Sequence, residues 1–255
     1  MKRMGLILAM GVWIAAMGAF GRSEAAPAAI LGDTDFNQGV ALMQKGRLDD
    51  AILAFKKALK TNPDHVGAHV NLGAAYQQKK MVNDAIREYY MAIFSQPNNA
   101  TARYNIAMLF IQKNQPDSAL TLLKEAVKVS PNYDAAYVEM GKLMFKKGAV
   151  DDAIAAYRQG LKAKIDNVDA HVNLGEALSK KGVLDEAIFQ FKEAIKYKPD
   201  HPEAHFKLAF ALMDKGDNEG AIDEFKAFLK YSMNVAGYDQ WRSAAAQNIQ
   251  ALGGK

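Results

Sequence analysis

Apolar positions recur along this chain with the spacing of helices, and the pattern returns every 34 residues. In the stretch 66–99, Leu72 and Tyr76 fall on one face of a first expected helix, and Tyr89 and Ala92 fall on one stripe of a second. Apolar residues three or four positions apart share one side of an α-helix. The pattern therefore predicts two amphipathic helices joined by a short turn.

At three positions of this pattern, the side chain keeps a similar size in all six copies of the stretch. The first is always alanine, the second carries at most a methyl group, and the third is always large and apolar. Because small residues let two helices approach while a large side chain fills the space beside them, the pattern predicts antiparallel helix pairs. The residues are Ala51, Ala85, Ala119, Ala153, Ala187 and Ala221; Gly39, Gly73, Ala107, Gly141, Gly175 and Ala209; and Phe55, Tyr89, Leu123, Tyr157, Phe191 and Phe225.

Glycines and prolines mark the expected ends of these helices. A glycine ends the first helix without strain in a left-handed conformation, and a proline cannot continue the second. The glycines are Gly46, Gly148, Gly182 and Gly216, and the prolines are Pro63, Pro97, Pro131 and Pro199. A fixed period in units that cannot bury their apolar faces alone predicts a stacked array.

The repeat resembles the tetratricopeptide repeat (TPR) family, whose pattern is W-x2-L-G-x2-Y, then A-x3-F, then P. The resemblance implies an all-α, right-handed α-solenoid of six helix-turn-helix repeats, at 32–65, 66–99, 100–133, 134–167, 168–201 and 202–235. Departures occur at the two ends, where Asp35 and Gln38 replace an aromatic residue and a leucine, and Phe228 replaces a small residue. The stretch 238–252 has one apolar face and predicts a capping helix.

The amino terminus has the composition of a bacterial secretory signal. Residues 1–25 combine Lys2 and Arg3, an apolar run, and small residues before an expected cleavage after Ala25. Residues 26–31 are expected to be a flexible lead-in. The repeats would then be periplasmic or secreted. The alternative is an uncleaved inner-membrane anchor with the repeats facing the periplasm, the only case in which a membrane contact is expected.

Charge and motifs argue against several classes of function. The net charge is +4, both signs are interspersed along the expected helices, and the chain has no cysteine. We therefore expect no nucleic-acid partner and no disulfide. No nucleophile motif or phosphate-binding loop stands outside the repeats, so no catalysis and no cofactor are expected. His65 with His69 and His201 with His205 have a spacing that zinc accepts, but packing is the favoured role and no metal site is predicted.

A ligand is expected on the concave surface that first helices line in this family. Four asparagines in one column, Asn37, Asn71, Asn105 and Asn173, offer amides that can bind the backbone of an extended peptide, although ordinary surface asparagines explain them as well. Large apolar and basic side chains in neighbouring columns extend the candidate groove. The remaining candidates are Val70, Tyr104, Met108, Ile111, Lys142, Phe145, Lys146, Phe206 and Phe210.

The sequence therefore predicts a non-catalytic TPR scaffold or adaptor in the bacterial envelope. Its concave groove would bind a peptide or protein during assembly of a larger complex. The alternative is a self-assembling structural protein that forms homo-oligomers through its ends or convex surface. The identity of the partner and the pathway are left open by the sequence.

Overall fold

The structure is a computed structural model that describes residues 32–254, and this range contains helices and turns but no strand. The expected signal peptide (1–25) and lead-in (26–31) lie outside the described residues. The described residues fall into two compact units, one ending at Lys113 and one beginning at Asn114. The prediction of an all-α repeat fold is confirmed.

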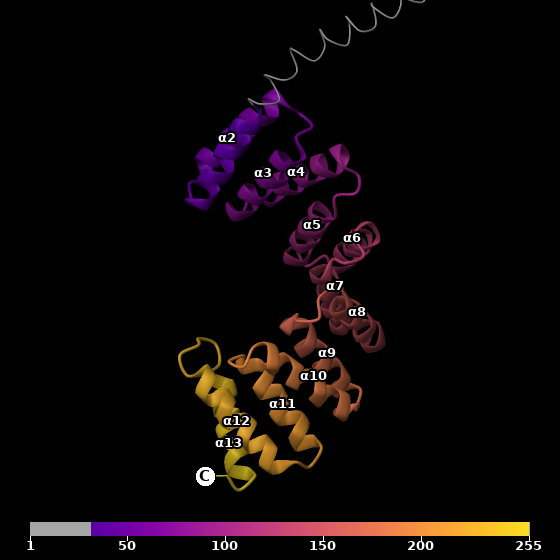
Figure 1. The fold of residues 1–255 in the computed structure, drawn as a ribbon, viewed down its shortest axis with the longest axis vertical. Coiled ribbons are helices and arrows are strands. Elements are labelled where there is room, and N and C mark those ends of the chain that lie inside the picture. Colours follow the sequence, from indigo (N-terminus) through magenta and orange to yellow (C-terminus); the bar gives the residue numbers. More distant parts are fainter. Residues whose placement is uncertain (1–31, 255) are drawn as a thin grey trace, which may run out of the picture. The chain divides into compact units, whose positions relative to one another are not determined.

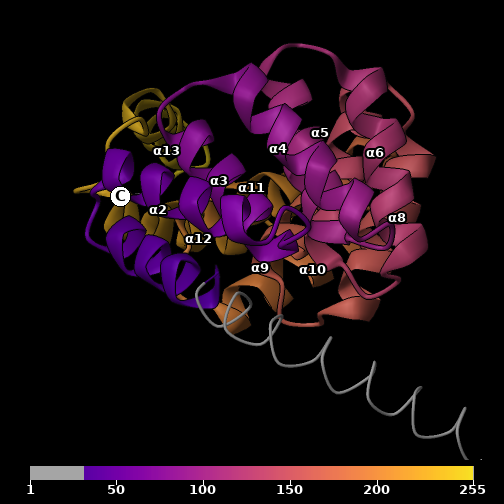
Figure 2. The same cartoon turned by 90° about the horizontal axis from the view of Figure 1, so that it is seen from above.

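The first unit contains a helix over residues 32–44 and four further helices (Figure 1). Within this unit, α2 contacts α3, α3 contacts α4, and α4 contacts α5. The helices are α2 (Leu48–Thr61), α3 (Val66–Gln78), α4 (Val82–Ser95) and α5 (Ala100–Gln112). Figure 2 views the same helices from above.

The second unit contains eight helices in its described residues, and each contacts the next. The first helices of its successive repeats also touch one another, since α9 contacts both α7 and α11. The helices are α6 (Pro116–Val129), α7 (Asp134–Lys146), α8 (Val150–Ala163), α9 (Val168–Lys180), α10 (Leu184–Tyr197), α11 (Pro202–Asp214), α12 (Asn218–Ser232) and α13 (Asp239–Ala251). The division between the units falls between α5 and α6, inside the predicted third repeat.

A glycine on the first helix of a repeat packs directly against the large ring of the second. A Cβ atom built on Gly141 would lie 2.4 Å from the Tyr157 ring, and one built on Gly73 would lie 2.7 Å from the Tyr89 ring. Real Cβ atoms do not approach other atoms this closely, so the ring occupies the space of the missing side chain. Gly39 with Phe55 and Gly175 with Phe191 repeat the arrangement. The predicted packing of small against large residues is confirmed at these four sites.

The turn after each first helix contains one residue in the left-handed conformation. The four predicted glycines have φ between 72° and 86°. Lys80 and Asn114 occupy the same position in the other two repeats, with φ of 60° and 56°. Glycine adopts this conformation without strain, whereas a lysine does so at a cost. The turn therefore keeps its conformation even where the sequence lacks the glycine that favours it.

Ion pairs between neighbouring repeats form a regular series that the sequence analysis missed. Lys147 Nζ lies 2.5 Å from Asp117 Oδ1, and Lys181 Nζ lies 2.5 Å from Asp151 Oδ1. The same contact, at a spacing of 30 residues, joins Lys79 to Asp49 and Lys215 to Asp185. These side chains are largely exposed, so each pair contributes at most about 1 kcal/mol. The series joins adjacent repeats along one edge but adds little to their stability.

The last helix packs on the end of the array. Ala245 and Ile249 of α13 are buried, and Tyr238, Trp241 and Leu252 pack against the same apolar core. Phe228, which replaces a small residue of the repeat pattern, is fully buried, and its ring centroid lies 5.7 Å from that of Tyr238. The predicted capping helix is confirmed, and Phe228 departs from the pattern because it contacts the cap rather than another repeat. None of the helices in residues 32–254 has the length and hydropathy to cross a membrane.

Two glycine substitutions in one repeat test this packing. Gly141→Ala places a methyl group against the Tyr157 ring and should lower the free energy of unfolding by about 1 to 3 kcal/mol. Gly160→Ala is the matched control, because its Cβ would meet neighbours at ordinary distances of 3.4 Å or more. That change should raise the free energy of unfolding by about 0.5 to 1 kcal/mol. Effects of the same sign in urea melts would contradict the assigned packing.

Candidate functional site

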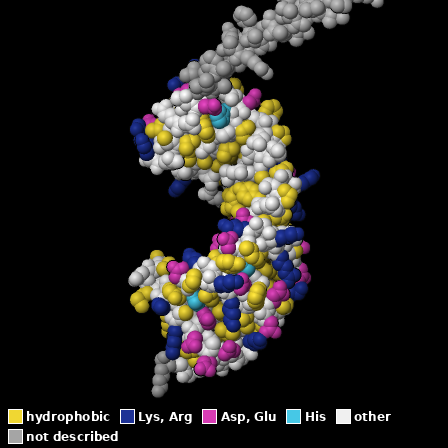
Figure 3. Space-filling view, viewed as in Figure 1, with side chains coloured by type: hydrophobic (Ala, Val, Ile, Leu, Met, Phe, Trp, Pro, Cys, Tyr) yellow, Lys and Arg dark blue, Asp and Glu magenta, His cyan; other side chains and the backbone are white. Residues whose placement is uncertain are grey.

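The surface of the second unit in Figure 3 mixes Lys and Arg with Asp and Glu. This face has no extended area of one sign. The candidate groove residues lie on first helices in both units.

In the first unit, α5 presents a row of partly exposed apolar side chains. Tyr104, Met108 and Ile111 are spaced one helical turn apart and are all half-buried. On the preceding first helices, Val70 and Asn71 are half-buried and Asn37 is exposed. The structure thus places these predicted residues where a partner can reach them.

The asparagines already form bonds within the fold. Asn71 Nδ2 donates to the Gly67 carbonyl at 2.8 Å, and Asn173 Nδ2 donates to the Asp169 carbonyl at 2.6 Å. Asn105 forms a hydrogen bond with the Tyr89 side chain. Each helix-internal bond fixes the orientation of its amide and leaves one N–H and the oxygen for a ligand. A peptide-binding role for this column stays a prediction.

On α7 in the second unit, the predicted apolar and basic residues pair with neighbours. Lys142 Nζ lies 2.9 Å from Glu139 Oε1. The Phe145 ring is half-buried and lies beneath Lys180 of α9, whose Nζ is 4.8 Å from the ring centroid. Lys146 is exposed. Lys180 therefore lies over this ring, a contact that the sequence analysis did not identify.

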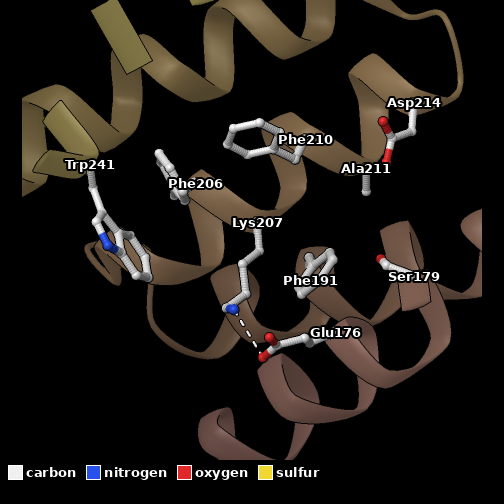
Figure 4. Close-up of a pocket in the computed structure, with 9 residues that line it drawn as sticks. All are labelled: Glu176, Ser179, Phe191, Phe206, Lys207, Phe210, Ala211, Asp214 and Trp241. Atoms are coloured by element: carbon white, nitrogen blue, oxygen red, sulfur yellow. Dashed lines mark ion pairs between the residues drawn. The ribbon is translucent and has the colours of Figure 1, made fainter. Parts of the chain in front are cut away.

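A pocket of about 260 Å³ lies among α9, α10, α11 and α13, around the predicted residues Phe206 and Phe210 (Figure 4). The Phe206 ring stacks on Trp241 of the cap, with centroids 4.6 Å apart. The cap therefore covers part of Phe206 but leaves a pocket beside it. The full lining is Glu176, Ser179, Phe191, Phe206, Lys207, Phe210, Ala211, Asp214 and Trp241.

Sequence analysis missed Glu176, Ser179 and Trp241 as members of this site. A signal was present for the first two, since Glu176 stands in the repeat column of Lys142 and Phe210, and Ser179 in that of Phe145. Trp241 carried no such signal because it lies outside the repeats. Its place at the pocket follows from the docking of the cap.

Lys207 is the central charge of the pocket. Its Nζ lies 2.9 Å from Glu176 Oε2 and 3.5 Å from Glu203 Oε1. It also lies 6.0 Å from the centroid of the Trp241 ring. Two carboxylates therefore flank this ammonium group and balance its charge.

Two buried histidines join the helices of their repeats. Nδ1 of His69 lies 2.9 Å from Glu88 Oε2, and its Nε2 lies 2.8 Å from the Pro63 carbonyl. His205 makes the same two contacts, with Glu224 at 2.6 Å and the Pro199 carbonyl at 2.9 Å. No cluster of metal-binding side chains occurs in the described part of the chain. The buried rings thus connect the two helices of a repeat to the preceding turn.

His65 and His201 have a different role, as N-caps of α3 and α11. Nδ1 of His65 accepts from the Ala68 N–H at 3.1 Å, and Nδ1 of His201 accepts from the Ala204 N–H at 3.2 Å. Asparagines take this position in α5 and α9. The two His-x3-His pairs are therefore each one cap and one interhelical contact.

Comparison with known proteins agrees with the repeat fold. The family model described as the cilia and flagella-associated protein 70 C-terminal domain matches residues 8–247. A search of curated proteins found no match.

Three solved structures illustrate the likeness. The structure titled "Crystal structure of MamA" is 30% identical, with a TM-score of 0.57, and the alignment covers 63% of this chain and 94% of that one. "Crystal structure of PilW, widely conserved type IV pilus biogenesis factor" is 18% identical, with a TM-score of 0.67 and coverage of 84% and 98%. "Crystal structure of YrrB: a TPR protein with an unusual peptide-binding site" is 22% identical, with a TM-score of 0.55 and coverage of 74% and 94%. At 18% and 22% identity, the last two likenesses establish the fold alone.

The histidine–carboxylate contacts predict how stability depends on pH. Burial lowers the pKa of His69, but the hydrogen bonds to Glu88 and the Pro63 carbonyl, with the charge of Glu88, outweigh it and raise the pKa above 6.5. The pKa of His205 is raised by the same balance of causes. Each group therefore stabilises the fold fully below pH 6.5, and this contribution is lost as the pH rises through the folded-state pKa.

Glu88→Gln with Glu224→Gln removes both charges and keeps a side-chain oxygen, as Gln190 does beside His171. Urea melts between pH 5.5 and pH 9 should show that the wild type loses more stability with rising pH than the double variant does. Identical slopes in the two proteins would contradict the assignment.

Proposed function

The chain belongs to the tetratricopeptide repeat family, and from this premise we propose that it is a non-catalytic scaffold of the bacterial envelope. It binds a peptide or protein segment on the concave surface lined by its first helices, during assembly of a larger complex. The observation that carries the proposal is the row of Tyr104, Met108 and Ile111 on α5. Partly exposed apolar side chains one turn apart on a first helix suit a partner's apolar side chains, and methionine adapts to their shape.

The envelope location rests on the signal-like residues 1–25. PilW, a structural neighbour, is titled a type IV pilus biogenesis factor, and YrrB a protein with a peptide-binding site. These titles support assembly and peptide binding as functions that the same fold performs elsewhere. They do not name a partner for this chain.

Affinity capture with matched variants tests the groove. The protein is immobilised, cross-linked to envelope extract, and compared with Tyr104→Ala, Met108→Ala. The control is Leu53→Ala, Ile165→Ala, which shortens two exposed apolar side chains that belong to none of the proposed surfaces. A partner that the control retains and the α5 variant loses, with equal helicity by circular dichroism, supports the proposal. Equal capture by all three proteins contradicts it.

A second candidate function, self-assembly, is favoured by the outer face of α4. Tyr90, Met91 and Phe94 are 46%, 40% and 78% exposed. In the repeat column of Phe94 the other five residues are all lysines: Lys60, Lys128, Lys162, Lys196 and Lys230. The column of Tyr90 likewise holds Lys or Arg in each of the other five repeats. An apolar patch at one repeat, where the others are charged, suits an isologous contact with the same patch of a second copy.

Phe94→Lys introduces the lysine that the other five repeats carry at this position, and it tests self-assembly. Sedimentation equilibrium over a range of protein concentrations should show oligomers for the wild type and fewer for this variant. Phe189→Lys is the control, since Phe189 is 56% exposed on α10 but lies outside the α4 patch. A wild type that stays monomeric at every concentration would rule this candidate out.

A further inference from the structure

The pocket beside the cap lies where one repeat position carries a small side chain and the other repeats carry a larger one. Ser179 stands where the other repeats have Met43, Gln77, Ile111, Phe145 and Met213. Each of those side chains is larger than serine, and Ser179 lines the pocket together with Phe191 and Ala211 (Figure 4). The cavity is therefore a local departure from the repeat pattern, not a property of every repeat.

The walls of the pocket are held in place by ring contacts. Phe210 meets Phe206 edge-on, with centroids 5.0 Å apart, and meets the buried Phe225 edge-on at 5.2 Å. Phe206 is held from the other side by Trp241. Rings fixed by several contacts cannot rotate to fill the space, so the pocket is preformed.

A polar group in the lining has no partner within the fold. Ser179 Oγ is buried and makes no hydrogen bond to any described residue. Helical Thr121 and Ser243 donate to the carbonyl four residues earlier, at 3.1 Å each. Ser179 does not, and an unsatisfied buried hydroxyl is costly. A ligand that supplies a hydrogen-bond partner here removes that cost.

The rim of the pocket carries an excess of negative charge. Lys207 is the only cation of the described lining, and it is already paired with Glu176 and Glu203. Asp214 is exposed and forms no ion pair with any described residue. The carboxylate of Asp214 therefore favours a cationic group on the ligand.

From these contacts we propose that the pocket binds an aromatic side chain of a partner peptide that carries a lysine or arginine next to it. The proposal rests on the function proposed above and names the chemistry of one subsite of the partner. The volume of about 260 Å³ lies below the range of roughly 300 to 1,000 Å³ typical of whole small-molecule sites. It suits one ring held among Phe206, Phe210 and Trp241. The peptide lies against the side of the pocket that Ser179 lines, and the basic residue pairs with Asp214.

Calorimetry with synthetic peptides tests the pocket. The probe is an alanine-based peptide with one phenylalanine flanked by lysines, compared with versions in which the phenylalanine is alanine or the lysines are glutamates. Each change should weaken binding at least tenfold. Binding of all three peptides with equal affinity, or of none, overturns the proposal.

Variants of the protein then localise the binding. Ser179→Phe introduces the residue that stands at the equivalent position of the fourth repeat, Phe145, and should abolish binding of the probe peptide. Asp214→Asn, on an exposed side chain that the fold does not need, should reduce the preference for lysine over glutamate peptides. Asp152→Asn is its matched control on α8 and should leave the preference unchanged. A Ser179→Phe protein that binds as the wild type does, or an unchanged preference in Asp214→Asn, overturns the proposal.

The result of the peptide experiments can be distinguished from the result of the affinity capture described above. Tyr104→Ala, Met108→Ala changes the first unit only and should bind the probe peptide normally. Capture of an envelope partner without probe binding would reject the pocket and keep the scaffold function. Loss of probe binding in Ser179→Phe, while the α5 variant still captures every partner, would support the pocket proposal and reject the α5 groove.

Discussion

The contact between a glycine of one helix and a ring of the next is the constraint on which this structure depends. Only a residue without a side chain leaves room for the rings of Tyr89, Tyr157 and Phe191 at their observed distances. The contact recurs in four of the six helix pairs, and the other two place an alanine, Ala107 or Ala209, at the position of the glycine. A small residue on the first helix thus faces a large one on the second throughout the array.

Once this contact fixes each pair, the other columns of the repeat are free to vary. Two of the three binding surfaces that we propose, the pocket beside the cap and the patch on α4, arise in this way. Ser179 opens a pocket in a column that is otherwise filled by larger side chains, and Phe94 makes an apolar patch in a column of lysines. Function in such an array is carried by local departures from the pattern, whereas the pattern itself carries the fold.

Most of the fold could be predicted because its signals are local and repeated. The period, the small and large positions, the turn glycines and the cap each appear in the sequence, and the structure agrees with them. The site was only partly predictable. Phe206 and Phe210 were identified from their column, but Trp241 reaches them through the docking of α13, and a contact between separate elements leaves no periodic signal. The histidine–carboxylate contacts were missed because their partners lie 19 residues apart on different helices.

The most direct test of the central contact is a double-mutant cycle on Gly175 and Phe191. A Cβ atom at position 175 would lie 2.6 Å from the Phe191 ring, whereas the third repeat combines Ala107 with the smaller Leu123. Gly175→Ala and Phe191→Leu should each lower the free energy of unfolding, and the double variant should lose less than their sum by about 1 kcal/mol or more. Additive losses in the urea melts would show that the glycine and the ring do not constrain each other, and would contradict this account.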